Sequence, residues 1–200
     1  MKPRDTSATR QRILAAADRL FYGQGIRAVG VDTIAAGAGI SKRTLYNHFP
    51  SKDELIVAYL QGRMQPPRPA SGDPAGEVLR LFKLMSRVFA QEGFRGCPFV
   101  NAVAEVGDDN PAARALAVAF KEQRRLWFRD LLVLAEARDA DGLAMQLMLL
   151  LDGAIAAALV RRDPSVADAA CAAVRTLLAA AGVPADRLDE VAAAKPRTGV

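Results

Sequence analysis

A run of cationic and hydrogen-bonding side chains lies between Ser41 and Phe49. If this stretch is helical, only Leu45 and Phe49 remain as apolar anchors. The other side chains could all face a partner: Lys42, Arg43, Thr44, Tyr46, Asn47 and His48. Lys and Arg neutralise phosphates, and Arg and Asn make bidentate contacts with base edges. The residue types therefore predict a helix that binds double-stranded DNA.

Other kinds of chemistry find little support in the chain. His48 is the only histidine, so a Ser-His or Cys-His pair would have to use the same helix. Cys97 and Cys171 match no metal or redox spacing and are expected to be reduced thiols. A degenerate G-x-G-x-x-A pattern at 23–28 follows an expected helix, whereas dinucleotide binding requires a strand there. Carboxylates at 105–109 precede an Asn-Pro pair, where helix capping is the simpler role. We expect no enzymatic activity, metal or cofactor.

The positive charge is concentrated in one part of the chain. The formal net charge is +5; residues 1–63 hold 10 Lys and Arg against 5 Asp and Glu, whereas residues 64–200 hold 17 of each. All of the excess therefore lies around the cationic helix. A solvated basic face is the simpler alternative, but it would be expected to spread its charge evenly. The concentration indicates a surface that binds phosphates.

Helical periodicity dominates the sequence, and no strand pattern is evident. Four helices are expected near the amino terminus: residues 7–22, about 31–38, a third capped by Ser41, and a fourth starting at a Ser51–Glu54 capping box and reaching about Arg63. Gly39 permits the turn before the third helix. This spacing is typical of a helix-turn-helix.

A proline-rich stretch after Arg63 separates this head from a second helical part. Asp-Pro and Asn-Pro pairs, which suit helix starts, recur beyond it. The helices expected there are 73–92, 110–138, 141–162 and 163–182. We predict a DNA-binding domain at 1–63, an effector-binding and dimerisation domain at 64–185, and a flexible tail at 186–200.

Residues 31–55, VDTIAAGAGISKRTLYNHFPSKDEL, follow a long first helix. This arrangement resembles the DNA-binding head of TetR-family transcriptional regulators, over about residues 7–60. The resemblance implies an all-α fold of about nine helices, with a three-helix helix-turn-helix head and a helical body. It also implies a homodimer that binds a palindromic operator, most often a repressor released by a small-molecule effector. The cytoplasmic location is expected from the reduced cysteines.

The resemblance assigns roles to individual residues. Four align with positions that contact phosphates in the family: Thr33, Tyr46, His48 and Lys52. Four others lie on the first two turns of the expected recognition helix, where base edges are contacted: Lys42, Arg43, Thr44 and Asn47. Lys42 and Asn47 could instead contact only the DNA backbone, and His48 could be a structural residue. Lys2, Arg4 and Arg10 could form an arm that reaches the neighbouring groove, or a floppy tail.

Bulky apolar side chains of the second part could line an effector pocket. Such pockets combine aromatic rings and Met with a few polar groups. The candidates are Phe82, Met85, Phe89, Phe99, Val103, Phe120, Arg124 and Trp127. The alternative is an ordinary aromatic core. If the pocket exists, its effector is expected to be largely apolar.

The most apolar stretch, Leu143 to Val160, raises the question of a membrane span. Asp152 lies near its middle, and a charge at the centre of a bilayer costs about 2.5–3.5 kcal/mol. We therefore expect a helix buried between protein surfaces and no membrane partner. Small residues here and on the last helix would let both pack closely against symmetry mates in a homodimer: Gly153, Ala154, Ala157, Ala158, Ala169, Ala170, Ala172 and Ala173. They could instead form the core of a monomer.

Two rival functions remain open from the sequence. One is a small-molecule-binding or helical interaction protein whose basic head is incidental. The other is an enzyme with a buried substrate cavity, which the shortage of catalytic groups disfavours.

Overall fold

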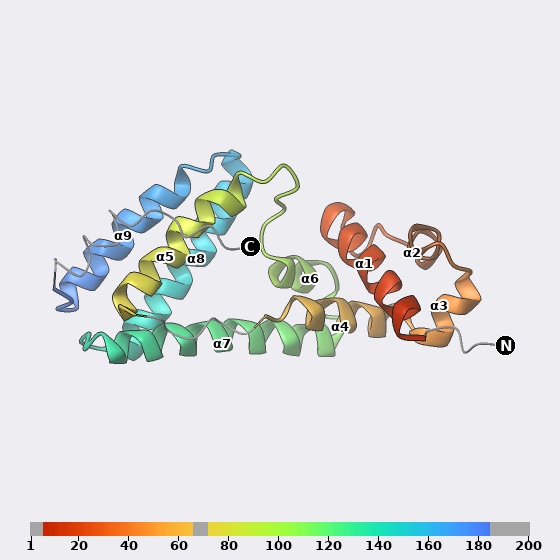
Figure 1. Cartoon of the computed structure of the whole chain (residues 1–200), viewed down its shortest axis with the longest axis horizontal. Helices are drawn as coiled ribbons and strands as arrows, with labels where there is room; N and C mark the ends of the chain where they lie inside the picture. Colours follow the sequence, from red (N-terminus) through yellow and green to blue (C-terminus); the bar gives the residue numbers. More distant parts are fainter. Residues whose placement is uncertain (1–5, 66–71, 185–200) are drawn as a thin grey trace. The chain divides into compact units, whose positions relative to one another are not determined.

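The computed structural model describes residues 6–65 and 72–184. Within these ranges the chain forms nine helices and no strand, as expected (Figure 1). The helices are α1 (Thr6–Gln24), α2 (Val31–Ala38), α3 (Lys42–His48), α4 (Lys52–Arg63), α5 (Pro74–Phe89), α6 (Pro98–Val106), α7 (Pro111–Leu134), α8 (Ala140–Arg161) and α9 (Val166–Ala180). The predicted tail at 186–200, the arm residues Lys2 and Arg4, and most of the proline-rich stretch lie outside the described residues.

The chain divides into two compact units. The first, which we call the head unit, comprises the described parts of Met1–Gln65 together with Cys97–Phe120. The second, the body unit, comprises the described parts of Pro66–Gly96 and Lys121–Val200. Helix α6 and the first part of α7 therefore pack with the amino-terminal helices, although they follow α5 in sequence.

The head unit is built on the apolar stripe of α1. Ile13, Ala17, Leu20 and Phe21 are all buried, which confirms the predicted inward face. Helix α1 contacts both α2 and α4. Phe21 meets Tyr59 of α4 edge to face, with ring centroids 5.5 Å apart. This core positions α2 and α4. The short α3 connects these two helices in the chain, so its ends are positioned as well.

Predicted caps account for four helix starts. In each, a side-chain oxygen accepts a hydrogen bond from the backbone N–H three residues later, which satisfies an otherwise unpaired donor. The pairs are Ser41 with Thr44 (3.1 Å), Ser51 with Glu54 (3.1 Å), Asp73 with Gly76 (2.6 Å) and Asn110 with Ala113 (2.9 Å).

Other helix ends differ from the prediction. Asp163 does not cap α9; it accepts a hydrogen bond from the backbone of Ser165 (2.9 Å) in the preceding turn, and Ser165 is the residue before the helix. Helices α5 and α7 end at Phe89 and Leu134, a few residues early. After α7 the chain turns through Glu136, whose φ of 57° is left-handed and interrupts the helix.

Helix α6 lies between the helices predicted at 73–92 and 110–138, where no helix was assigned from the sequence. Cys97 precedes it with extended backbone, and Pro98 occupies the first helical position, where its missing N–H costs nothing. Phe99 and Ala102 are buried. The ring of Phe99 stacks on that of Phe120 from α7, with centroids 4.0 Å apart. The apolar face of α6 therefore belongs to the head unit.

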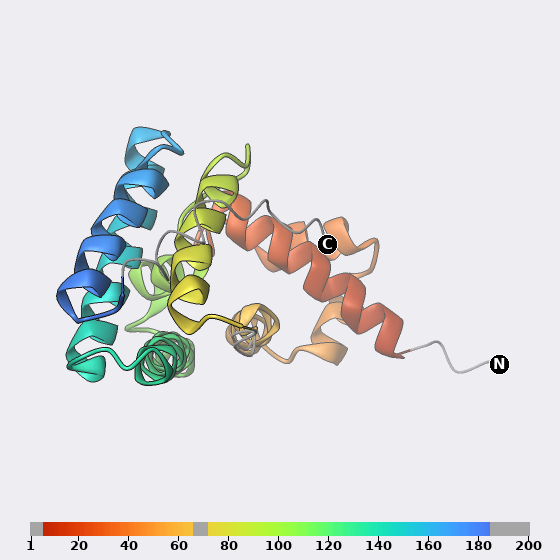
Figure 2. The ribbon, with the colours of Figure 1, turned by 60° about the vertical axis from the view of Figure 1, so that its left-hand side comes forward.

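The body unit packs α5, α8 and α9 side by side (Figures 1 and 2). Phe82 and Phe128 are fully buried at its centre, with ring centroids 6.2 Å apart. By length and composition, α8 is the one helix in the described ranges that could cross a membrane. Leu147 and Leu151 of α8 nevertheless lie in the core of the body unit, as in a core helix of a helical protein.

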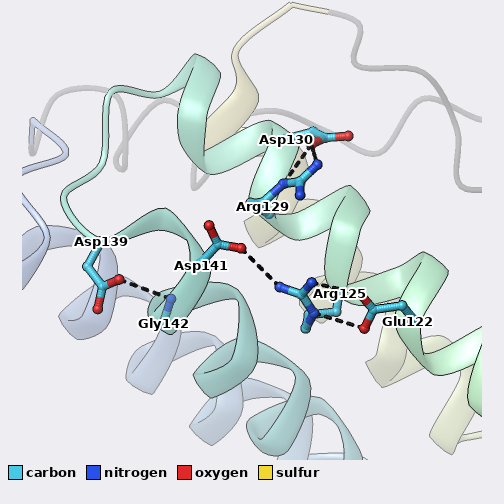
Figure 3. A network of polar contacts seen from close by, with 7 residues as sticks. All are labelled: Glu122, Arg125, Arg129, Asp130, Asp139, Asp141 and Gly142. Atoms are coloured by element: carbon cyan, nitrogen blue, oxygen red, sulfur yellow. Dashed lines mark hydrogen bonds and ion pairs between the residues drawn. The ribbon is translucent and has the colours of Figure 1, made fainter.

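Polar contacts tie α7 to α8 within the body unit. Arg125 forms ion pairs with Glu122 (2.7 Å) on its own helix and with Asp141 (3.1 Å) at the start of α8 (Figure 3). Hydrogen bonds to these carboxylates raise the pKa of Arg125. Half-buried Lys121 pairs with Asp152, the acidic residue in the apolar stretch of α8. Asp152 is thus neutralised within the protein.

Some small residues predicted for an intermolecular face lie inside the body unit. The buried ones are Ala154, Ala158 and Ala170. They face inward because α8 and α9 pack on each other, and each helix turns one stripe toward its neighbour. Gly153, Ala169 and Ala172 remain exposed. The prediction of an intermolecular face was therefore wrong for the three buried alanines.

Candidate nucleic-acid interface

The turn between α2 and α3 depends on Gly39. Its backbone is left-handed, with φ of 64°, a conformation that L side chains adopt at a cost. Ile40 donates its N–H to the carbonyl of Ala35 (3.0 Å), which closes the end of α2. Arg12 of α1 donates to the carbonyls of Ala38 (2.5 Å) and Gly39 (3.1 Å). These contacts set the direction in which α3 leaves the turn.

Helix α3 is held by the two residues expected to anchor it. Leu45 is fully buried, and Phe49, which follows the helix, is 3% exposed. The guanidinium of Arg10 lies 4.8 Å from the centre of the Phe49 ring, a cation–π contact. Arg10, one of the predicted arm residues, is thus engaged with the end of α3 within the head unit.

The remaining side chains of α3 are largely available to a partner. Arg43, Tyr46 and Asn47 are exposed, and they form no hydrogen bond or ion pair within residues 6–65 and 72–184. Thr44 is half-buried, and its hydroxyl lies 2.9 Å from that of Ser41. An Arg fork and an Asn amide on one short helix can read base edges in a major groove.

Lys42 differs from its neighbours because it is already paired. Its Nζ lies 3.0 Å from Oδ2 of Asp32, the second residue of α2. The hydrogen bond and charge of Asp32 raise the pKa of Lys42. Lys42 was predicted as a DNA-contacting residue, and this pairing across the turn was not anticipated.

The predicted phosphate contacts occupy different settings. Thr33 is exposed in the first turn of α2, and Lys52 is half-buried at the first position of α4. Helix amino termini favour anions, so both positions suit phosphate binding. Partial burial lowers the pKa of Lys52, although the charges of Asp53 and Glu105 oppose this effect.

His48, the last residue of α3, is half-buried. It lines an open groove of about 440 Å³ within the head unit. The other lining residues come from α1, α4 and the start of α7 or flank them: Arg10, Phe49, Asp53, Glu54, Val57, Ala58, Gln61, Asn110 and Ala112. This setting agrees with either role considered for His48, phosphate contact or structural packing beside Phe49.

A set of hydrogen bonds from Arg27, in the loop after α1, to the end of α6 was not predicted; we call it the Arg27 clasp. The backbone N–H of Arg27 donates to the Glu105 carboxylate (2.9 Å), and its side chain bonds to the Glu105 carbonyl and to Asp109 (2.9 Å). Gly25 packs so closely on Glu105 that an added Cβ would lie 3.0 Å from its carboxylate. Nearby, the Asn110 amide donates to the Asp53 carbonyl (3.4 Å). Helix α6 is thereby tied to the loop between α1 and α2.

A second contact that was not anticipated joins α1 to α4. Arg63 forms a bidentate ion pair with Asp18 (2.5 and 2.9 Å). The Arg63 guanidinium also lies 4.4 Å from the ring centre of Tyr22 and 5.4 Å from that of Tyr59. Bidentate pairing combined with ring stacking suits Arg specifically, so Lys would not replace it. This contact fixes the far end of α4.

The predicted effector-pocket residues fall in both units. Phe82, Met85, Phe89, Arg124 and Trp127 belong to the body unit, whereas Phe99, Val103 and Phe120 belong to the head unit. Several rings pair with other rings in their own unit: Phe82 with Phe128, Phe89 with Phe94, and Phe99 with Phe120. Arg124 lies 5.7 Å from the centre of the Trp127 ring. The effector pocket stays a prediction.

Comparison with known protein families supports this reading of the head. Residues 13–59 match the family described as "Bacterial regulatory proteins, tetR family". Residues 74–173, half of the chain, match the family described as "Transcriptional regulator LmrA/YxaF-like, C-terminal domain".

Two curated relatives are similar over parts of the chain. The HTH-type transcriptional regulator LmrA of Bacillus subtilis is 32% identical over 124 residues, which make up 57% of this chain and 66% of LmrA. The HTH-type transcriptional activator FasR of Mycolicibacterium smegmatis is 49% identical over 59 residues, 30% of this chain and 26% of FasR. The chain thus spans less than two thirds of the length of either relative.

Solved structures extend the similarity to most of the chain. A TetR-family transcriptional regulator from Streptomyces coelicolor has a TM-score of 0.77 and 33% identity, covering 88% of this chain and 96% of that one. A tetr-transcriptional regulator from Streptomyces avermitilis has a TM-score of 0.78 and 32% identity, covering 88% and 99%. With a helix-turn-helix head, a matching helical body and these relatives, the chain belongs to the TetR family of DNA-binding transcriptional regulators.

Proposed function

We propose that the chain is a cytoplasmic homodimeric repressor that presents two copies of α3 to a palindromic operator. The observation that carries this proposal is the exposed face of α3, where the side chains of Arg43, Tyr46 and Asn47 form no hydrogen bond or ion pair within the described residues. Polar side chains on a rigidly anchored helix suit base edges and phosphates. Two heads related by two-fold symmetry would contact major grooves about 34–36 Å apart.

Exposed apolar side chains on α8 support the dimer. Met145, Leu149 and Val160 are 49%, 67% and 84% exposed, although α8 is the most apolar helix. Gly153 and Ala156 lie between them on the same exposed stripe, at helical spacing. Ala169 and Ala172 of α9 are exposed as well. A contiguous apolar surface of this kind is typical of a protein interface.

An apolar effector is the proposed signal for release from DNA. Its support is that Phe82, Met85 and Phe89 of α5 and Trp127 of α7 belong to or pack against one hydrophobic cluster of the body unit. Arg124 lies 5.7 Å from the centre of the Trp127 ring. Differential binding of about 1–3 kcal/mol between DNA-bound and free forms would change occupancy substantially. Thermal shifts with a panel of aromatic and long-chain aliphatic probes, followed by titration of the protein–duplex complex, would test this step. A probe that stabilises the protein without weakening the complex would contradict it.

DNA recognition is tested by selecting binding sequences from a random pool of duplexes. The selected duplex and a scrambled duplex of the same composition are then titrated by fluorescence anisotropy at several salt concentrations. We expect an enriched palindrome and an affinity that falls steeply with salt, because phosphate contacts release counterions. No enrichment over the starting pool at low salt would contradict the proposal. A promoter–reporter assay with the selected site then distinguishes repression from activation.

A further inference from the structure

The pair between Lys42 and Asp32 bridges the two helices of the helix-turn-helix. It joins the first residue of α3 to the first turn of α2, with a Nζ–Oδ2 distance of 3.0 Å. The Lys42 and Asp32 side chains are 51% and 73% exposed. No packed side chain has to move for this pair to open. The contact is therefore reversible and lies on the surface proposed to face DNA.

A carboxylate and a backbone phosphate are equivalent partners for an ammonium group. We propose that Asp32 is an affinity-limiting residue of the DNA-binding surface, which competes with duplex phosphates for Lys42. A phosphate that takes Lys42 as its partner draws the ammonium away from Asp32, and the carboxylate then faces a polyanion. The inference rests on the proposed function, since it takes α3 as the helix that enters the groove.

The competition distinguishes Lys42 from the other cations of the head. Arg43 has no ion pair within the described residues, and Lys52, although it lies in the field of Asp53 and Glu105, has none there either, so no bonded carboxylate has to be displaced from them. Lys42 and Asp32 together bring no net charge to the duplex. Each phosphate newly neutralised by a protein cation steepens the dependence of log affinity on log salt by about 0.9. Removing the charge of Asp32 should therefore convert Lys42 into an additional phosphate contact.

The test is a double-mutant cycle of full-length proteins: wild type, Asp32→Asn, Lys42→Ala and the double variant. Each is titrated against the selected and the scrambled duplex over a range of salt concentrations. Asp32→Asn should bind both duplexes more tightly, by about threefold to eightfold per head at 0.1 M salt, with a slope steeper by about 0.9 per head. Lys42→Ala should weaken binding more in the Asp32→Asn background, where Lys42 has no carboxylate partner, than in the wild type, where Asp32 already occupies it.

Asp32→Glu is the matched control, because it keeps the negative charge on a side chain that still reaches Lys42. If Asp32 competes for Lys42, Asp32→Glu should bind DNA about as tightly as the wild type. Only Asp32→Asn should gain affinity. Unchanged or weaker binding by Asp32→Asn would overturn it, as would an equal loss from Lys42→Ala in both backgrounds. Failure of the proposed function would appear separately, as a wild type that binds neither duplex at low salt.

Discussion

Arg43 and Lys52 are both cations of the head, but the structure places them differently. Arg43 is exposed in the first turn of α3, whereas Lys52 is half-buried at the start of α4. Base edges distinguish sequences, whereas phosphates are the same on every duplex. The two residues should therefore be separable by comparing the selected with the scrambled duplex.

Arg43→Lys should weaken binding to the selected duplex by about 1–3 kcal/mol, because Lys lacks the fork that pairs with guanine. Binding to the scrambled duplex should change little, since the charge is kept. Anisotropy titrations of both duplexes measure this difference. Equal losses on the two duplexes would refute a base-reading role for Arg43.

Lys52→Ala should weaken binding to both duplexes alike and reduce the salt slope by about 0.9 per head, as expected for the loss of one phosphate contact. The control is Lys83→Ala on α5, which removes the same charge from the body unit. A Lys83→Ala variant with the same loss would show that net charge, rather than the position of Lys52, sets the affinity.

At the scale of elements, the turn between α2 and α3 determines how α3 is presented. Gly39→Ala should lower the free energy of local unfolding of α2 and α3 by about 1–2 kcal/mol, because an L side chain there is forced into the left-handed region. An added Cβ would also lie 3.0 Å from Nη2 of Arg12. Native-state hydrogen exchange of the α2 and α3 amides measures this local stability.

Gly62 provides a matched control for this substitution. It lies near the end of α4, is exposed, and has open space around an added Cβ. Gly62→Ala should therefore stabilise the protein by up to about 1 kcal/mol, since Ala is the better helix former. Protection of α2 and α3 in Gly39→Ala equal to that of the wild type would contradict the requirement for a left-handed residue.

Much of the helical fold could be predicted because its signals are local. The caps at Ser41 and Ser51, and the stripe of α1, each depend on residues within a few turns. Helix α6 was missed because it is short, follows Gly96 and begins with Pro98, and Gly and Pro are also typical of turns. Pro98 begins a helix here because its apolar face meets Phe120 in the head unit.

The polar contacts of the head were less predictable. The Arg27 clasp joins residues 78 positions apart, so no local pattern indicates it. Lys42 and Asp32 are only ten positions apart, yet they become partners only once the turn at Gly39 brings α2 and α3 together. The types of residue on α3 indicated DNA, but their availability depends on contacts that form on folding.

At the scale of the molecule, the proposed dimer depends on the exposed stripe of α8. Leu149→Glu should dissociate the dimer and weaken operator binding, because a buried, unpaired carboxylate at an interface is costly. Sedimentation velocity measures the mass of the particle. Leu84→Glu is the control, since Leu84 is 47% exposed on α5 and lies outside the proposed interface. A Leu149→Glu protein that remains dimeric would refute this interface.

The central claim is that two copies of α3 lie in neighbouring major grooves of one palindromic site. Hydroxyl-radical footprinting of the wild-type protein on the selected duplex tests it most directly. We predict two protected half-sites whose centres are about 10–10.5 base pairs, or a multiple of that spacing, apart and related by two-fold symmetry. Protection of a single half-site by a monomer, or uniform protection without register, would contradict the claim.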